Sequence, residues 1–172
     1  AVHAFVHGGY WQALSADDGM GLAPAFHAAG VAFASVNYTL CPGAPLAELV
    51  RQVRSAVRFL ASPGAPGPAH DPARVHLSGH SAGAHLVAMA AADPSCPMAG
   101  ATFVSGVYDL VPLLETTVND AVGLDLPTAQ ELSPLGHVPE RTGVPTIVTW
   151  GEDDTDEFRR QSLAWAAAWT SR

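Results

Sequence analysis

The sequence predicts an α/β fold, a mostly parallel sheet covered by helices on both faces. Short apolar runs that end in turn residues alternate along the chain with longer stretches of helical periodicity. The 172 residues are 48% hydrophobic, which is enough to bury one substantial core. We therefore expect a single domain over residues 1–172, in which the turn-rich stretch 62–73 is an internal loop and not a linker.

The expected strands and helices follow from the periodicity of the apolar residues. Strands are predicted at residues 1–9, 31–38, 74–78, 99–105 and 144–151. Residues 24–29 are predicted to lie within a helix, and further helices are predicted at 46–62, 82–92 and 156–169. Residues 108–141 are rich in Pro, Asp, Leu and Thr and have weak periodicity, so we expect short helices and loops that form a cap or pocket wall over the strand ends.

Composition excludes several classes of partner and chemistry. The net charge is −8, and all eight basic residues are scattered arginines, which argues against a nucleic-acid partner. Without lysine, neither Schiff-base catalysis nor a phosphate-binding P-loop is available. No apolar run reaches about 18 residues, so no membrane partner is expected. Cys41 and Cys96 lie far apart, which favours a reducing, cytoplasmic location; assembly as a homodimer stays open.

A serine lies between two glycines at residues 79–83, in the pattern G-x-S-x-G. A predicted strand precedes this motif and an alanine-rich helix follows it, which is the context of a nucleophile on a tight strand-to-helix turn. The helix would direct its N-terminal N–H groups toward a carbonyl oxygen that becomes negative during acyl transfer. We therefore predict that Ser81 is a nucleophile. The alternative is that Ser81 only caps the helix.

A second glycine-rich stretch, HGGYW at residues 7–11, follows the first predicted strand. Its glycines would let backbone N–H groups approach a ligand closely. Together with the N–H of Ala82, such a loop would complete an oxyanion hole. The alternative is a plain glycine turn.

The eight histidines do not predict a metal site. His3 and His7 fall on one side of a strand, and His80 and His85 flank the predicted nucleophile. Neither pair has further Asp, Glu or Cys residues at metal-ligand spacing. We therefore expect no metal and no cofactor.

A serine nucleophile needs a histidine base and an acid that orients it. Asp154 follows the strand at 144–151, with Asp153 beside it, and Asp109 follows the preceding strand; a solvated acidic run is the alternative for Asp154. In this architecture the order along the chain is nucleophile, acid, histidine, yet no histidine follows Asp154. We expect that the chain is truncated at both ends and that the base lies beyond Arg172. His137, which precedes the acid, is the alternative base.

Several stretches together resemble the arylformamidase (kynurenine formamidase) branch of the α/β-hydrolase superfamily. They are HGGYWQAL, NYTLCPGAPLAELVRQVRSAV, GHSAGAHLVAM, SGVYDLVPL, ELSPL and DTDEFRRQSLAWAAAW. The resemblance implies an α/β-hydrolase fold and the metal-free hydrolysis of an N-formyl arylamine, such as N-formylkynurenine, to formate and the free amine. It also implies roles for particular residues: Ser81 as nucleophile, Asp154 as acid, Gly8, Gly9 and Ala82 as oxyanion hole, and Tyr10, Trp11 and Tyr108 as aromatic walls.

Two other functions fit the same sequence. A carboxylesterase for small esters would use the same glycine loop and serine turn. A non-catalytic protein could bind an aryl ligand on the same scaffold without turning it over.

Overall fold

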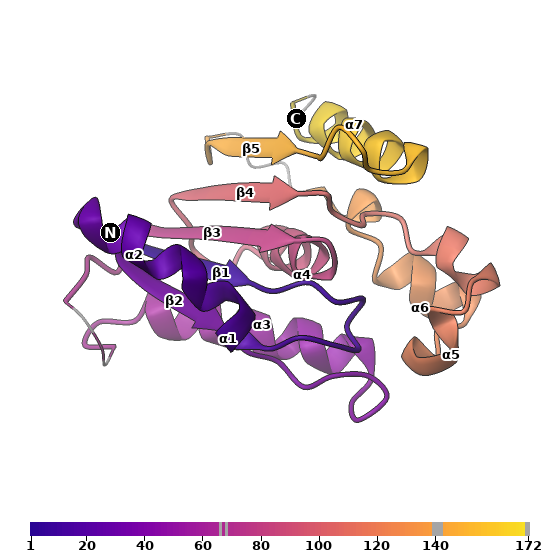
Figure 1. Ribbon diagram of the computed structural model, residues 1–172, viewed down its shortest axis with the longest axis horizontal. Helices are drawn as coiled ribbons and strands as arrows, with labels where there is room; N and C mark the ends of the chain where they lie inside the picture. Colours follow the sequence, from indigo (N-terminus) through magenta and orange to yellow (C-terminus); the bar gives the residue numbers. More distant parts are fainter. Residues whose placement is uncertain (66, 68, 139–142, 171–172) are drawn as a thin grey trace.

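The computed structural model describes residues 1–65, 67, 69–138 and 143–170, and its centre is a five-stranded sheet (Figure 1). The strands lie in the order β2-β1-β3-β4-β5, and every neighbouring pair is parallel. They are β1 (Val2–Val6), β2 (Ala32–Val36), β3 (Val75–His80), β4 (Gly100–Val104) and β5 (Thr146–Thr149). The predicted parallel sheet is confirmed.

Helices cover both faces of this sheet. Helices α1 (Ala16–Gly19) and α2 (Ala23–Ala28) lie against β1 and β2 on one face, whereas α3 (Leu46–Leu60) and α4 (Ala82–Ala91) pack together on the other (Figure 1). Helix α7 (Asp156–Thr170) runs beside β5. Residues 24–29, which the sequence predicts to lie within a helix, fall in α2 and at its C-cap, whereas α1, which was not predicted, begins at a capping box formed by Ser15 and Asp18.

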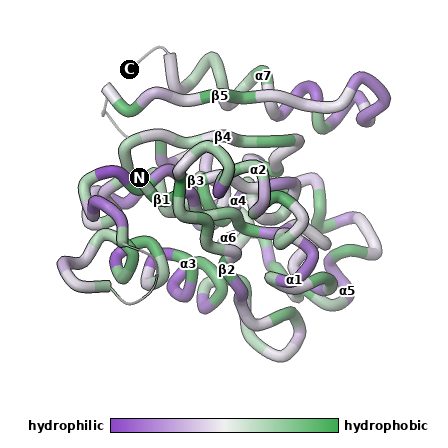
Figure 2. Tube along the Cα trace, turned by 60° about the vertical axis from the view of Figure 1, so that its left-hand side comes forward, coloured by the Kyte–Doolittle hydropathy of each residue, from purple (hydrophilic) through white to green (hydrophobic). Residues whose placement is uncertain are grey.

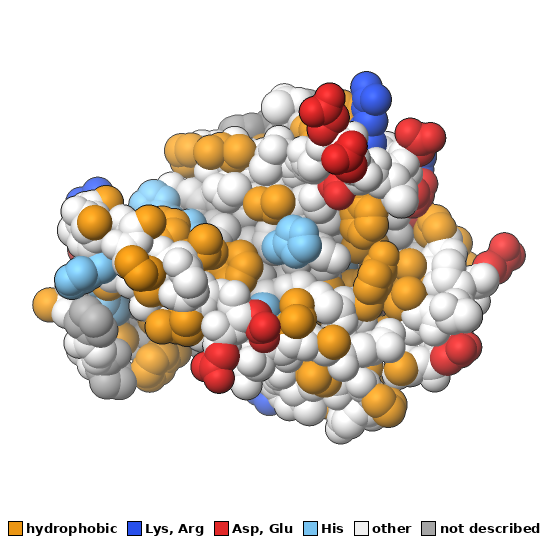
Figure 3. All heavy atoms as spheres, in the orientation of Figure 1, with side chains coloured by type: hydrophobic (Ala, Val, Ile, Leu, Met, Phe, Trp, Pro, Cys, Tyr) orange, Lys and Arg blue, Asp and Glu red, His pale blue; other side chains and the backbone are white. Residues whose placement is uncertain are grey.

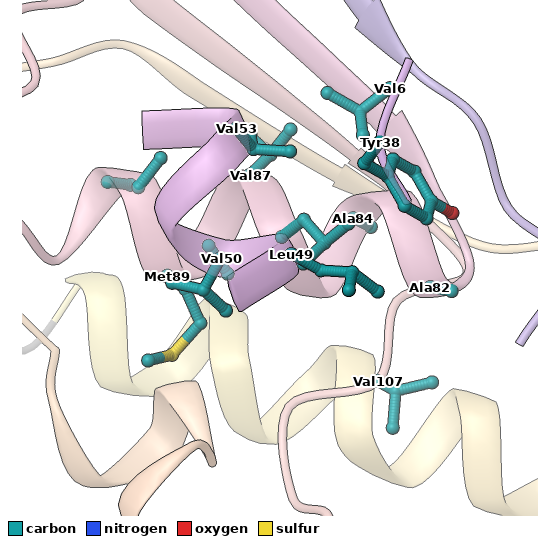
Figure 4. Close-up of a cluster of buried hydrophobic side chains, with 14 of the residues drawn as sticks. Val6, Tyr38, Leu49, Val50, Val53, Ala82, Ala84, Val87, Met89 and Val107 are labelled. Carbon is teal, nitrogen blue, oxygen red and sulfur yellow. The ribbon is translucent and has the colours of Figure 1, made fainter. Parts of the chain in front are cut away.

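The core lies between α3, α4 and the sheet. All ten residues of α4 are buried, and most of them are alanine or glycine, which lets α3 approach closely. Leu49 and Val53 of α3 lie over Ala84 and Val87 of α4 in Figure 4. Outside this core, hydrophilic residues gather at the turn from β5 into α7 (Figure 2). The apolar stripe on α3 follows the spacing of a helix with one buried face.

The segment between β4 and β5 lies beyond the carboxyl ends of the strands (Figure 1). It contains the 3₁₀ helices η2 (Val111–Glu115) and η3 (Pro134–Gly136) and the short helices α5 (Asn119–Val122) and α6 (Leu126–Glu131). Short helices and loops were expected here; residues 139–141 of that expectation lie outside the described residues. Among the helices that the structure describes, none is both long enough and apolar enough to cross a membrane.

The strand order identifies one position in the sheet at which a functional site is expected. From β1 the chain moves outward to β2, whereas from β3 it moves in the opposite direction to β4. In open α/β sheets a ligand site is expected at the carboxyl ends of two adjacent strands where the chain direction reverses in this way. HGGYW follows β1 and Ser81 follows β3, so both motifs lie at this position of the sheet.

Candidate active site

Ser81 occupies the turn between β3 and α4 in a backbone conformation that side chains rarely adopt. Its φ is 54° and its ψ is −119°. A non-glycine residue held there costs on the order of 1–3 kcal/mol, so the surrounding structure must enforce it. The backbone N–H of Ser81 donates a 2.9 Å hydrogen bond to the carbonyl oxygen of Val104 in β4, which fixes the turn to the sheet.

The two glycines of the motif are required by close backbone packing. A Cβ atom on Gly79 would overlap the carbonyl group of Gly83, and a Cβ atom on Gly83 would overlap the backbone carbonyl of Val6. Both clashes involve backbone atoms, which cannot move aside as a flexible side chain could. The G-x-S-x-G pattern is therefore the one that lets helix α4 start directly against β1.

The hydroxyl of Ser81 is not used to cap the helix. Ser81 occupies the N-cap position of α4, but its side chain makes no capping hydrogen bond. The residue is 8% exposed. The interpretation of Ser81 as a simple helix cap is therefore wrong, because its hydroxyl caps no N–H group of α4.

The glycine loop after β1 lies directly against the serine. A Cβ atom on Gly8 would be 3.3 Å from Cβ of Ser81 and 3.0 Å from the carbonyl oxygen of His80. Gly9, Tyr10 and Trp11 follow with φ values of 99°, 48° and 60°. Three consecutive residues in the left-handed region turn the chain sharply beside the nucleophile. The N–H of Ala82, in the first turn of α4, has no partner within its own helix and directly follows Ser81 in the chain.

Tyr38 braces the same loop, a role that the sequence analysis did not identify. Its hydroxyl donates to the carbonyl oxygens of His7 and Gly8, at 2.9 and 3.1 Å. Its ring stacks on that of His7, with 4.2 Å between the ring centroids. The signal was present in the sequence, because Tyr38 follows the second strand and so ends beside the loop that follows the first.

Asp154 is held rigidly after β5. Its Oδ2 accepts hydrogen bonds from Oγ of Ser105, at 2.6 Å, and from the backbone N–H of Gly151, at 2.9 Å. These hydrogen bonds, that of Ser105 first, hold the pKa of the Asp154 carboxyl below its usual range. Oδ1 accepts no hydrogen bond from any residue that the structure describes. The carboxylate can therefore receive one more N–H, as an acid that orients a histidine does.

The other two acid candidates are arranged differently. Asp109 forms an ion pair with Arg160, 3.5 Å away, and accepts the N–H of Val111. Asp153 is exposed beside Asp154. Of the three, Asp154 is the one whose hydrogen bonds to Ser105 and Gly151 leave one carboxylate oxygen without a partner among the described residues.

The structure separates His137 from the serine. Its Nε2 is 2.6 Å from the carbonyl oxygen of Glu131, and the residue lines a pocket with Met89 and Ala92. Those residues lie at the far end of α4, roughly 10–15 Å along the helix from its first turn. The alternative of His137 as the base is therefore wrong for this structure. No histidine in the described ranges forms a hydrogen bond with Ser81 or Asp154, although His80 is near enough to Asp154 to contribute to the lowering of the pKa of its carboxyl group.

The three predicted aromatic walls take two different places. Tyr10 is 38% exposed and lines a pocket of about 160 Å³ with Val107, Leu113 and Phe158. Trp11 and Tyr108 are fully buried instead. Trp11 contacts the ring of His85, and Tyr108 stacks on Trp165, so in this structure both rings pack beneath the site and do not line it. The sequence did not indicate which of the three aromatic rings is buried: Tyr10 and Trp11 are adjacent in the chain, yet only one of them is exposed.

No group of three His, Cys, Asp or Glu side chains is placed to hold a metal ion within the described part of the chain. Some of the acidic side chains seen in Figure 3 lie over the β5–α7 turn, and others are spread over the rest of this face. In α7, Glu157 is engaged by Arg160 through two hydrogen bonds of 2.7 and 2.6 Å. The chemistry that this site offers is that of a serine, an acid and backbone donors.

The fold and the serine turn define the class of this protein, which is the α/β-hydrolases. Solved structures agree. A candidate thioesterase from Silicibacter sp. tm1040 is similar with a TM-score of 0.85 and 31% identity, over 98% of this chain and 64% of that one. An esterase from Thermogutta terrifontis matches 99% of this chain and 68% of its own with a TM-score of 0.77. Its 22% identity supports the shared fold alone.

Within this class, the chain belongs to the BD-FAE family, whose model matches residues 2–98. The kynurenine formamidase of Salmo salar is 34% identical over 92% of this chain, and that of Danio rerio is 33% identical over 92%. The chain spans 55% and 56% of the lengths of these two relatives. The resemblance to the arylformamidases is thereby confirmed.

Proposed function

We propose that the protein is a serine hydrolase that works through an acyl-enzyme formed on Ser81. The observation that carries this proposal is the Ser81 turn itself. The backbone of Ser81 has a strained conformation, and its hydroxyl does not cap α4. The residue lies against the backbone of Gly8. Strain at a residue that does nothing for packing or capping is typical of a functional site.

The reaction follows from the groups around the serine. Oγ of Ser81 attacks the substrate carbonyl carbon while its proton passes to a histidine, and the carbonyl oxygen becomes an oxyanion. The N–H groups of Gly8, Gly9 and Ala82 are the proposed donors to this oxygen. The bond to the leaving group then breaks, and that group departs with the proton that the histidine returns. Water then attacks the acyl-serine while its proton passes to the histidine, the ester bond to Oγ of Ser81 breaks, the histidine returns the proton to Oγ, and the acid is released.

Asp154 is the proposed acid, which holds the histidine in the required tautomer. Its free Oδ1 and its two hydrogen bonds through Oδ2 support this role. The histidine itself is proposed to come from beyond Arg172, in keeping with the order of the three groups along the chain.

The proposed substrate is an N-formyl arylamine such as N-formylkynurenine, which would give formate and the free amine. Two kinds of observation support it. Relatives over most of this chain are named kynurenine formamidases. The pocket beside Tyr10 also presents the apolar side chains of Val107, Leu113 and Phe158, which could contact an aryl group, together with the polar side chains of Thr155, Glu157 and Gln161. Residues 108–138 contribute Leu113 to this pocket, so the segment is proposed to be a pocket wall.

The second candidate is a carboxylesterase for small esters, and the esterase named among the similar structures favours it. The two are separated by kcat/KM for N-formylkynurenine against p-nitrophenyl acetate, measured on the full-length protein. A formamidase favours the formamide even though the ester is intrinsically more reactive. Preference for the ester would assign the protein to the esterases. Ser81→Ala is the control that removes both activities.

A non-catalytic scaffold is disfavoured by the free Ser81 hydroxyl, and a fluorophosphonate probe tests it directly. Such a probe labels an activated serine and leaves an inert one unmodified. We also propose a cytoplasmic location, which the two unpaired cysteines, Cys41 and Cys96, support.

A further inference from the structure

The loop that approaches Ser81 needs an anchor. Gly9, Tyr10 and Trp11 all have positive φ, and two of them are not glycine. Such a conformation persists only where neighbouring groups enforce it. Backbone bonds within the loop contribute, since the N–H groups of Gln12 and Ala13 both donate to the carbonyl oxygen of Gly9.

Trp11 connects this loop to the core. Its ring is fully buried, and its carbonyl oxygen accepts the N–H of Cys41 at 2.8 Å. The indole meets the imidazole of His85 edge to face, with 5.1 Å between ring centroids and 87° between ring planes. The position of the loop therefore depends on where the ring of His85 lies.

His85 is one turn after Ser81 on α4, and its N–H donates to the carbonyl oxygen of Ser81 at 3.2 Å. The side chain is fully buried. Its Nε2 is 2.8 Å from the carbonyl oxygen of Leu132, directly after α6. Because a carbonyl only accepts, Nε2 must bear a hydrogen, and in the neutral ring Nδ1 is then an acceptor.

Packing alone does not explain a histidine at this position. Nδ1 of His85 and Nε1 of Trp11 are both buried, and neither has a hydrogen-bond partner among the described residues. A buried polar atom without a partner is destabilising, and leucine in place of His85 would avoid this cost for Nδ1. What histidine adds is the hydrogen bond to Leu132, which joins the nucleophile helix to the segment after β4.

We propose that His85 is a positioning residue that fixes the glycine loop and the nucleophile helix to residues 108–138. His85 joins three parts of the site. Its backbone belongs to α4, its ring contacts the glycine loop through Trp11, and its Nε2 bonds the segment after β4 at Leu132. The bond to Leu132 sets the orientation of the imidazole, and the imidazole sets the position of Trp11. This inference rests on the proposed function, because the loop is expected to supply the oxyanion donors.

The test uses three variants of the full-length protein. In His85→Gln the side-chain amide can reach Leu132 from nearly the place of Nε2, whereas in His85→Asn it is too short, and His85→Leu has no donor. His3→Leu is the matched control. His3 is a partly buried histidine that stacks on Phe26 and bonds Oγ of Ser78, but it lies near the opposite end of β1.

Two quantities are measured for each variant: kcat and KM for p-nitrophenyl acetate, and the rate at which a fluorophosphonate labels Ser81. We expect His85→Leu and His85→Asn to lose about 10- to 100-fold in kcat with little change in KM, since small displacements of catalytic groups have effects of this size. His85→Gln and His3→Leu should stay within a few-fold of the unmodified protein. If His85→Leu does not fold, the comparison of kcat between His85→Gln and His85→Asn tests the positioning role.

Equal kcat in the Gln, Asn and Leu variants would overturn the positioning role, and so would a loss confined to KM. Failure of the proposed function looks different. In that case the unmodified protein would neither hydrolyse the ester nor be labelled at Ser81, and both proposals would be overturned together.

Discussion

The hydroxyl of Ser105 donates a 2.6 Å hydrogen bond to Oδ2 of Asp154, and this bond joins the carboxyl ends of two adjacent strands. Ser105 directly follows β4 and has a φ of 48°, while Asp154 lies in the turn after β5. The bond occupies one carboxylate oxygen and leaves the other available. Asp154 is therefore oriented before any histidine reaches it.

Replacing Asp154 tests this orientation. Asp154→Asn should lower kcat by roughly 10³- to 10⁴-fold, because an amide cannot stabilise the imidazolium or select the tautomer. Asp153→Asn is the matched control, because Asp153 is adjacent and exposed, and it should keep full activity. Steady-state kinetics on the full-length variants measure both. A large loss in Asp153→Asn with activity retained in Asp154→Asn would reassign the acid.

The strain at Ser81 predicts a trade between stability and activity. Ser81→Gly should abolish turnover and raise the free energy of unfolding by about 1 kcal/mol, because glycine adopts this conformation without the penalty of a Cβ atom. Ser81→Ala should be equally inactive but no more stable, since alanine keeps the Cβ atom. Chemical denaturation of the two variants provides the comparison. Equal stability would mean that the turn is not strained.

The close approach of Gly8 predicts a strong effect of one methyl group. In Gly8→Ala the new Cβ atom would lie 3.0 Å from the carbonyl oxygen of His80 and 3.3 Å from Cβ of Ser81. We expect kcat to fall by about 10²-fold or more as the loop shifts away from the serine. Gly21→Ala is the control, since a Cβ atom there meets nothing within 4 Å. Unchanged kcat in Gly8→Ala would exclude this loop from the oxyanion site.

Burial of His85 predicts how stability depends on pH. Burial lowers the pKa of His85 to about 4, below its usual value of 6.5. Between these two values the unfolded chain binds the proton and the folded chain does not, so the free energy of unfolding falls as the pH falls from about 6.5 to about 4. The loss from His85 is at most about 3 kcal/mol.

Burial lowers the pKa of His3 to about 4 as well, which adds a smaller loss over the same range. Denaturation curves between about pH 7.5 and about pH 4.5 measure the sum. The slope should be shallower in His85→Gln, which has no group that titrates there. An identical slope in that variant would mean that His85 does not remain neutral in the folded protein.

The sequence alone predicted the sheet well because parallel strands buried on both faces are continuous apolar runs with turn residues at their ends. Every predicted strand is present, with ends shifted by a few residues. Residues 24–29 were predicted to lie within a helix, and α2 spans Ala23–Ala28. Helix α1 was not predicted, because its start depends on the capping pair Ser15 and Asp18 and not on an apolar stripe.

The site was predicted in part. Ser81 and the glycine loop were identifiable because G-x-S-x-G and HGGYW each require glycine for a backbone reason, and that reason is visible in the structure. Ser105, Tyr38 and His85 were not assigned roles, because each acts through a tertiary contact and belongs to no local motif. Trp11 and Tyr108 were misplaced as pocket walls, since a sequence does not distinguish an aromatic ring that lines a pocket from one that packs below it.

The measurement that tests the central claim most directly is the site of covalent labelling. The full-length protein would be treated with a fluorophosphonate, digested, and analysed by mass spectrometry, with Ser81→Ala treated in parallel. We predict one adduct, on the peptide that contains Ser81, and none in the Ser81→Ala protein. Absence of an adduct on Ser81, together with hydrolysis that persists in Ser81→Ala, would contradict the account.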